Sequence, residues 1–169
     1  MENNALDADF ADFIAALNKH GVDYVVIGGH AVGFHGYARA TEDLDVFVRR
    51  QLDNARKLKA AIEEFAGVHL DDQRFAATER ALVHIGPEAA GIDVLNYFKG
   101  TDEDRVLKAA ITANIDDLVV RFPTIQDLIA NKRATGRDVD LIDLKHLVEA
   151  EKILTRQSQA ERGRGGLEH

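Results

Sequence analysis

The stretch Tyr24-Val-Val-Ile-Gly-Gly-His-Ala-Val-Gly-Phe-His-Gly-Tyr-Ala-Arg-Ala-Thr-Glu-Asp-Leu-Asp-Val-Phe-Val48 decides the fold of this chain. Its first four residues form a continuous apolar run, which is typical of a short strand covered on both faces. Gly28 and Gly29 follow this run, and they permit a tight turn with positive φ or a close approach of the backbone. Residues 30–36 are expected to form a short helix. The first half of the stretch therefore predicts a strand, a glycine turn and a helix.

The second half of the stretch places two carboxylates at the head of another strand. Residues 44–48 form a second apolar run, and Asp43 and Asp45 stand at its start. Because side chains alternate between the faces of a strand, these two carboxylates project to the same side. A third acid, Asp93, stands alone in a later apolar run. Solvated charges at a strand edge are the alternative interpretation of the Asp-Leu-Asp pattern.

Three carboxylates that converge would repel one another, and their negative charge would have to be neutralised. If the strands of Asp45 and Asp93 are neighbours, the acids gather on one patch. Two like charges 4 Å apart repel by about 4 kcal/mol at an effective dielectric near 20. Such a cluster persists only with protons or divalent cations, and an all-oxygen site suits Mg²⁺ or Mn²⁺ rather than zinc. Two such ions would clamp the attacking and leaving oxygens of a phosphoryl displacement.

The glycine pair supplies a second element of the same hypothesis. A turn from strand to helix with free backbone N–H groups favours an anion such as phosphate. A plain turn would also explain Gly28 and Gly29. The Asp-x-Asp pattern downstream favours the phosphate interpretation.

The rest of the chain reads as a mixed sheet followed by helices, an α/β (α+β) class. Apolar periodicity predicts helices over 9–19, 52–65, 104–110, 124–132 and 138–154, and strands over 81–85, 91–98 and 115–122.

Composition indicates one domain. The chain has 169 residues. Its net charge of −8 disfavours broad nucleic-acid binding. Its lack of cysteine makes a cytoplasmic address the default expectation. No apolar run is long enough for a bilayer, so no membrane partner is expected. We expect one domain over 1–155, with a core over 20–122 and helices over 124–154. A disordered tail over 156–169 is expected to end in a tag remnant.

Together these motifs resemble the DNA polymerase β-like nucleotidyltransferase superfamily, whose signature is a glycine pair, an acidic pair on a strand and a third acid. The Gly-Gly-His-Ala-Val and Arg-Ala-Thr-x-Asp-Leu-Asp segments are most similar to a small bacterial group related to AbiEii-type abortive-infection nucleotidyltransferases. Residues 132–144 also match the Lys-x-Ala-x-Gly-Arg-x-x-Asp-x-x-Asp-Leu pattern of that group. The resemblance covers residues 20–150 and implies a mixed, mostly antiparallel sheet flanked by helices, with a helical C-terminal segment.

The resemblance also implies a reaction and the residues that perform it. A nucleoside monophosphate would pass from an NTP to an acceptor hydroxyl, with release of pyrophosphate. Gly28 and Gly29 would hold the triphosphate, and Asp43 and Asp45 would ligate Mg²⁺ or Mn²⁺. Asp93 would share the metal and help to deprotonate the acceptor.

Further basic and polar residues are candidates for nucleotide binding. Lys132 offers a point charge to the phosphates. Arg39, Thr41 and His30 flank the motifs, but a surface arginine, a strand-entry threonine and a packing histidine are equally good interpretations. Asp140 and Asp143 lie three residues apart on one face of the last predicted helix. This spacing favours an ion-pair network that holds the helix in place.

The acceptor stays open between a small molecule, a tRNA and a protein, and a homodimer or a partner protein is a further possibility. Two alternative functions stand beside the active enzyme. One is a toxin–antitoxin component, and the other is a catalytically inactive nucleotide-binding or scaffold protein that needs a partner chain.

Overall fold

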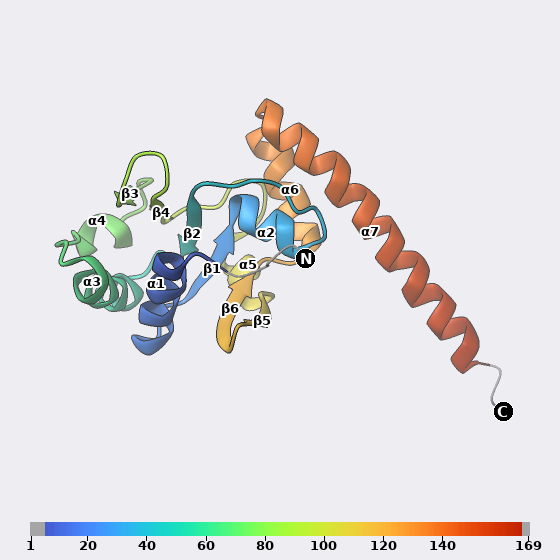
Figure 1. Cartoon of the computed structure of the whole chain (residues 1–169), viewed down its shortest axis with the longest axis horizontal. Helices are drawn as coiled ribbons and strands as arrows, with labels where there is room; N and C mark the ends of the chain where they lie inside the picture. The colour runs from blue at the N-terminus through green and yellow to red at the C-terminus, as the bar shows by residue number, and fades with distance from the viewer. Residues whose placement is uncertain (1–5, 167–169) are drawn as a thin grey trace.

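A four-stranded mixed sheet forms the centre of the computed structural model, which describes residues 6–166. Its strands are β1 (Tyr24–Ile27), β2 (Leu44–Val48), β3 (Leu82–Ile85) and β4 (Ile92–Leu95), in the order β1-β2-β4-β3 (Figure 1). The β1–β2 and β3–β4 pairs are antiparallel, and the β2–β4 pair is parallel. This confirms the predicted mixed, mostly antiparallel sheet flanked by helices.

The helices surround this sheet. They are α1 (Ala8–Lys19), α2 (Gly28–Phe34), α3 (Leu52–Ala66), α4 (Asp72–Ala76), α5 (Glu103–Lys108), α6 (Ile125–Thr135) and α7 (Asp138–Gly165). The short helix α2 begins at the glycine pair itself, two residues earlier than expected. The helix α4 lies in a segment for which the sequence showed no clear periodicity.

A separate hairpin corrects one predicted strand. The sequence suggested a single strand over 115–122, whereas the structure has β5 (Ile111–Ile115) and β6 (Leu118–Phe122), paired antiparallel. Asp116 and Asp117 form the turn with φ of 50° and 67°. Aspartate tolerates this left-handed conformation better than most residues, and two such residues in succession suit a two-residue hairpin loop.

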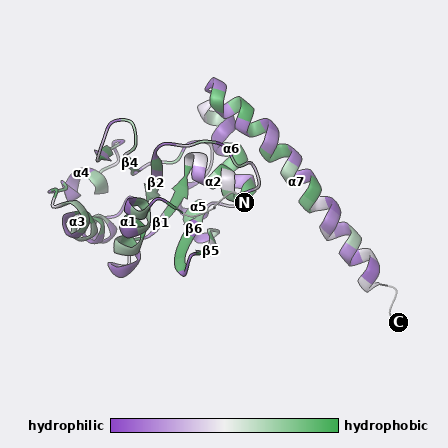
Figure 2. Cartoon of the chain, in the orientation of Figure 1, coloured by the Kyte–Doolittle hydropathy of each residue, from purple (hydrophilic) through white to green (hydrophobic). Residues whose placement is uncertain are grey.

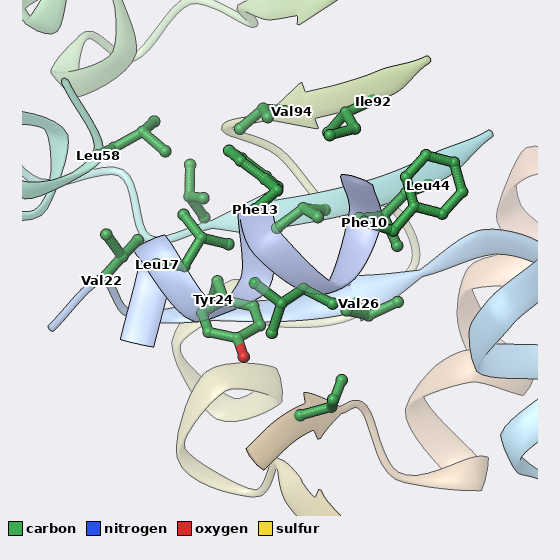
Figure 3. Close-up of a cluster of buried hydrophobic side chains, with 14 of the residues drawn as sticks. Phe10, Phe13, Leu17, Val22, Tyr24, Val26, Leu44, Leu58, Ile92 and Val94 are labelled. Atoms are coloured by element: carbon green, nitrogen blue, oxygen red, sulfur yellow. The ribbon is translucent and has the colours of Figure 1, made fainter. Parts of the chain in front are cut away.

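The two faces of the sheet carry different layers. On one face, Phe10, Phe13 and Leu17 of α1 pack toward Val26 and Leu44 in the larger hydrophobic cluster (Figure 3). A smaller apolar cluster covers part of the other face and consists of Val25, Phe47, Phe98, Val106 and Leu107. Because strand residues alternate, Asp45 and Asp93 project to this second face.

The long helix α7 extends away from the sheet (Figure 1). It continues to Gly165, so the expected helix end at residue 154 and the expected disorder from residue 156 are wrong for this segment. Residues 152–162 contain no proline and several strong helix formers, so their sequence is compatible with a continuation of α7. The suspected tag remnant over 167–169 lies outside the described residues. Within residues 6–166, no helix has the length and apolar character required to cross a membrane.

Asn96 provides a test of this fold at a buried polar contact. Its fully buried side chain accepts from the Ala81 N–H at 2.7 Å and donates to the carbonyls of Phe75 and Glu79. Asn96→Ala leaves these groups unpaired, so the free energy of unfolding should fall by about 1–3 kcal/mol in denaturant titrations. The exposed Asn114→Ala is the control, and an equal loss in both variants would contradict the role of Asn96.

Candidate active site

Two carboxylates face the same space from neighbouring parallel strands. Asp45 of β2 and Asp93 of β4 are register partners, as the sequence suggested. Burial, together with the negative charges of Asp93 and Asp43, raises the pKa of Asp45 to about 6. The site therefore concentrates negative charge in a partly desolvated place, where a cation or a proton would relieve the repulsion.

The Asp45 carboxylate lies so close to the backbone at position 28 that only glycine fits there. Gly28 has φ of +68°, and a Cβ built on it would lie 2.3 Å from Oδ2 of Asp45. A side chain at position 28 would therefore suffer both backbone strain and a clash with the acid. The strand-to-helix turn comes into close contact with the Asp45 carboxylate because Gly28 has no side chain.

Asp43 is placed differently from the other two acids. It precedes β2, and its Oδ1 accepts a hydrogen bond of 2.9 Å from the Gly91 N–H, just before β4. One oxygen of Asp43 thus holds two segments of the sheet together. No three His, Asp or Glu side chains within residues 6–166 are grouped in a way that could hold a metal ion. The predicted convergence is therefore seen for Asp45 and Asp93, with Asp43 as a nearby third charge.

A cavity of about 430 Å³ opens above the acids. Its polar lining combines predicted residues with others that the sequence analysis did not select: Gly28, Asp45, Asp93, Lys99, Asn131, Lys132, Thr135, Arg137 and Asp140. Leu82, Leu95, Tyr97 and Phe98 add apolar surface. The sheet supplies the acids, and the α6–α7 corner supplies the basic side chains.

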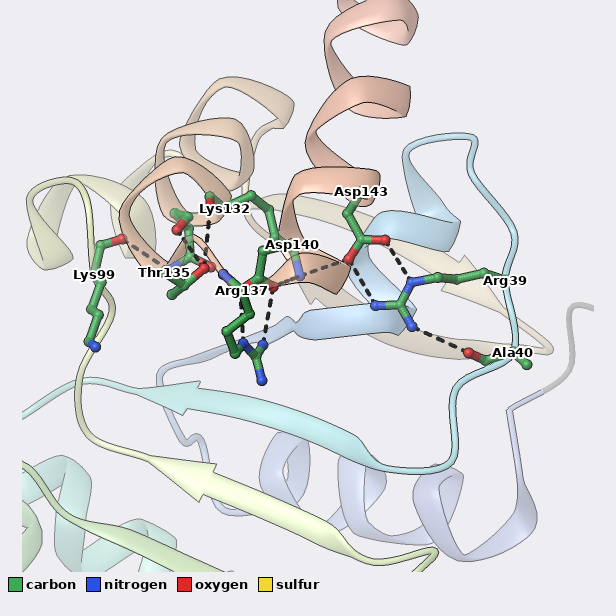
Figure 4. A network of polar contacts seen from close by, with 9 residues as sticks. Arg39, Ala40, Lys99, Lys132, Thr135, Arg137, Asp140 and Asp143 are labelled. Atoms are coloured by element: carbon green, nitrogen blue, oxygen red, sulfur yellow. Dashed lines mark hydrogen bonds and ion pairs between the residues drawn. The ribbon is translucent and has the colours of Figure 1, made fainter.

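A buried ion-pair network builds this corner (Figure 4). Lys132 Nζ lies 3.1 Å from Asp140 Oδ1 and 3.0 Å from Asp143 Oδ2. Arg39 donates two hydrogen bonds to Asp143, at 2.7 and 2.9 Å, and Arg137 donates to Asp140. Burial alone would raise the pKa of Asp143, but the bonds from Arg39 and Lys132 outweigh it and lower the pKa. The predicted network that holds the last helix is confirmed.

The network leaves Arg137 more accessible than Lys132. The side chain of Lys132 is 4% exposed and its charge is matched by two carboxylates, whereas that of Arg137 is 71% exposed. Arg137 points from the start of α7 toward the sheet (Figure 4), and the positive charges of Lys132 and Arg137 both act on Asp45. The sequence pattern contained Arg137, but only the three-dimensional contacts distinguish its role from that of Lys132.

Four residues expected at the nucleotide lie around a second cavity. Gly29, His30, Arg39 and Thr41 line a space of about 610 Å³ that also borders the β5–β6 hairpin. A Cβ at Gly29 would lie 2.6 Å from the Thr41 hydroxyl. Burial and the charge of Arg39 lower the pKa of His30, and its Nε2 is buried without a hydrogen bond. The structure therefore does not bring these four residues to the cavity above the acids.

His84 is a neighbour of the acids that the sequence analysis missed. It is the register partner of Asp93 across β3–β4. Its Nδ1 lies 2.6 Å from Asp93 Oδ1, and its Nε2 lies 2.9 Å from the Pro87 carbonyl. Because both partners are acceptors, the imidazole satisfies both only when doubly protonated. The hydrogen bond to Asp93 raises the pKa of His84, and strand register, which sequence does not reveal, is what pairs them.

Comparisons with known proteins agree with this architecture. A family model described as "Nucleotidyl transferase of unknown function (DUF2204)" matches residues 7–162. No curated protein matches the chain. Among solved structures, the lincomycin-bound lincosamide antibiotic adenylyltransferase LnuA is similar at 14% identity and a TM-score of 0.56, over 88% of this chain and 99% of that one. The antibiotic-resistance factor ANT(2'')-Ia is similar at 12% identity and a TM-score of 0.52, over 95% and 96% of the two chains.

The contact between Gly28 and Asp45 can be tested against a matched glycine. Gly28→Ala and Gly21→Ala both place alanine at a φ near +68°, which costs about 1–2 kcal/mol. Only Gly28→Ala adds a clash, because nothing lies within 4 Å of a Cβ at Gly21. Thermal unfolding should therefore show the larger destabilisation for Gly28→Ala, and equal shifts would contradict the close contact.

The buried network predicts a pH dependence of stability. The folded pKa of Asp143 is lowered, so its ion pairs stabilise the fold above the unfolded pKa of about 3.9 and are lost as the pH falls through the folded value. Asp143→Asn should lower the free energy of unfolding at pH 7 by roughly 3 kcal/mol. The difference from the parent should narrow below about pH 4. The exposed Asp12→Asn is the control; a gap that stays constant with pH would contradict this account.

Proposed function

Since the chain belongs to this family of nucleotidyl transferases, we propose that it transfers a nucleoside monophosphate from an NTP to an acceptor hydroxyl and releases pyrophosphate. The observation that carries this proposal is the pairing of Asp45 and Asp93 on adjacent parallel strands, against Gly28 and below an open cavity. A scaffold protein has no need to gather repelling carboxylates in a desolvated site.

The cavity offers a matching arrangement for a triphosphate. We assign the phosphates to the side lined by Gly28 and Arg137, where the glycine permits close approach and the guanidinium provides a fork of donors. Lys99 borders the same cavity and supplies a further positive charge. Lys132 contributes through its field and by holding the start of α7, because its own charge is already paired. Arg39 contributes by holding Asp143.

Two of the carboxylates offer donors to a divalent cation, while the described residues hold no group of three ligands already arranged for one. Asp45 and Asp93 offer oxygen donors of the type that Mg²⁺ or Mn²⁺ prefers, and the free oxygen of Asp43 is the third candidate. The charge that raises the pKa of Asp45 is the charge that a cation would offset. A bound ion would neutralise the phosphates and lower the barrier to displacement at the α-phosphorus.

The transfer itself makes one bond and breaks one. The acceptor oxygen bonds to the α-phosphorus as the bond to the pyrophosphate oxygen breaks. Asp93 takes the proton of the acceptor hydroxyl, and His84, hydrogen-bonded to the other side of this carboxylate, orients it. Arg137 compensates the charge that builds on the leaving pyrophosphate.

The acceptor that we favour is a small hydroxylated molecule. Similar structures include an adenylyltransferase bound to lincomycin and ANT(2'')-Ia in complex with adenylyl-2''-tobramycin, the latter at 13% identity and a TM-score of 0.50. The narrower relation to the abortive-infection group stays a proposal that rests on residues 132–144, and with it the partner-dependent alternative.

Label transfer tests the proposed reaction. The protein is incubated with α-phosphate-labelled NTPs, Mg²⁺ and cell extract, and labelled products are separated by size and charge. Asp93→Asn should reduce the rate of labelling by about 10²–10⁴-fold, because it removes the proton acceptor. Asp53→Asn, which is 78% exposed, should leave the rate unchanged.

The outcomes distinguish the candidate functions. A labelled small molecule supports the favoured acceptor, whereas label on RNA or protein replaces it with another class. No label with any NTP would contradict an active enzyme and favour the partner-dependent or inactive alternatives.

A further inference from the structure

The helix α7 carries an exposed row of side chains that its own domain does not cover. The row contains Asp138, Ile142, Lys145, Glu149, Ile153 and Arg156, and is here called the seam. Their spacings of three and four residues place them within an arc of roughly 80° on the helix surface. All six side chains are exposed.

The seam faces away from the side on which α7 packs. Asp140, Asp143 and Leu147 form the buried side of the helix. In contrast, Ile142 and Ile153 are 55% and 53% exposed, three helical turns apart on the seam. Five of the ten large hydrophobic residues exposed within residues 6–166 belong to α7, and two of these five, Ile142 and Ile153, lie on the seam. Figure 2 shows apolar bands recurring along this helix. A partner surface that covered these two isoleucines would remove their apolar area from water.

The order of charges along the seam is complementary to that of a second copy in antiparallel orientation. When Ile142 lies across from Ile153 of the partner, Asp138 lies across from Arg156 of the partner. The same register sets Lys145 across from Glu149 of the partner, so each ionic contact joins opposite charges. A parallel arrangement would place each of these charges across from its own copy, which is repulsive.

The shape of the molecule agrees with this orientation. The end of α7 over 152–165 is exposed and projects from the domain (Figure 1). An isolated helix draws little stability from propensity alone and usually depends on packing of one face. Antiparallel pairing lays this projecting end along the first half of the partner's α7 and keeps the two domains at opposite ends.

We propose that the chain forms a homodimer by antiparallel pairing of the seam of α7 with the seam of a second copy. The pairing is independent of the proposed transferase activity, since no seam residue lines the cavity above the acids. Two apolar side chains per helix make a small interface, so association should depend on concentration.

Charge reversal tests both the contact and its orientation. Asp138 and Arg156 are 18 residues apart, about 27 Å along one helix, so they cannot touch within one chain. Arg156→Asp alone and Asp138→Arg alone should each raise the dimer dissociation constant at least about tenfold in sedimentation equilibrium. The double variant should recover the parent value, and an equimolar mixture of the two single variants should associate more tightly than either alone.

Apolar variants and a control complete the test. Ile153→Asp should also abolish association, whereas Val68→Asp, at a site that is 42% exposed on another surface, should not. Circular dichroism confirms that each variant keeps its helix. A parent chain that stays at the monomer mass of 18.6 kDa at all concentrations would overturn the proposal. A double variant whose dissociation constant stays as high as that of the single variants would overturn the antiparallel register.

Discussion

The repulsion between Asp45 and Asp93 is the constraint on which the rest of the site depends. Register places these carboxylates opposite each other on β2 and β4, on the sheet face away from α1. Partial burial makes their negative charge costly, as the raised pKa of Asp45 shows. Neighbouring side chains partly compensate this charge. His84 is hydrogen-bonded to Asp93, and the positive charges of Lys132 and Arg137 act on Asp45. Negative charge at the acids therefore lies beside positive charge from Lys132 and Arg137, and the proposed binding of a cation and a triphosphate rests on this arrangement.

The C-terminal helices matter because they bring positive charge to this sheet. Lys132 is buried between two aspartates of α7, and Arg39 ties the same helix to the segment before β2. Removing one partner of a buried ion pair leaves an uncompensated charge, which is strongly destabilising. The network therefore fixes the start of α7, and with it the position of Arg137 at the cavity. Stability and the proposed ligand contacts are coupled through the same side chains.

Much of this architecture was predictable because its signals are local. The apolar run before Gly28, the Asp-Leu-Asp pattern and the periodic helices depend on neighbouring residues, and they predicted the elements that form. The tight turn at Gly28, with φ of +68°, belongs to the same class, whereas its contact with Asp45 depends on the pairing of β1 with β2. The Asp140–Asp143 pattern also indicated an ion-pair network, and the structure has one.

Other features depend on contacts between distant residues, and these were missed. The pairing of His84 with Asp93 follows from strand register, and the position of Gly29 and Thr41 around a second cavity follows from the path of the loop before β2. The β5–β6 hairpin was read as one strand because Asp116 and Asp117 are not an obvious turn pair. The end of α7 was predicted to be disordered because its residues are polar and show no apolar face that could pack against the rest of the chain.

The most direct test of the central claim is thermal unfolding of the protein with Mg²⁺ and an NTP, alone and together. If the carboxylates hold the cation and the NTP, the melting temperature should rise most with both ligands, and the rise should be lost in the Asp43→Ala, Asp45→Ala double variant. A double variant that responds like the parent would contradict the carboxylate site on which the proposed function rests.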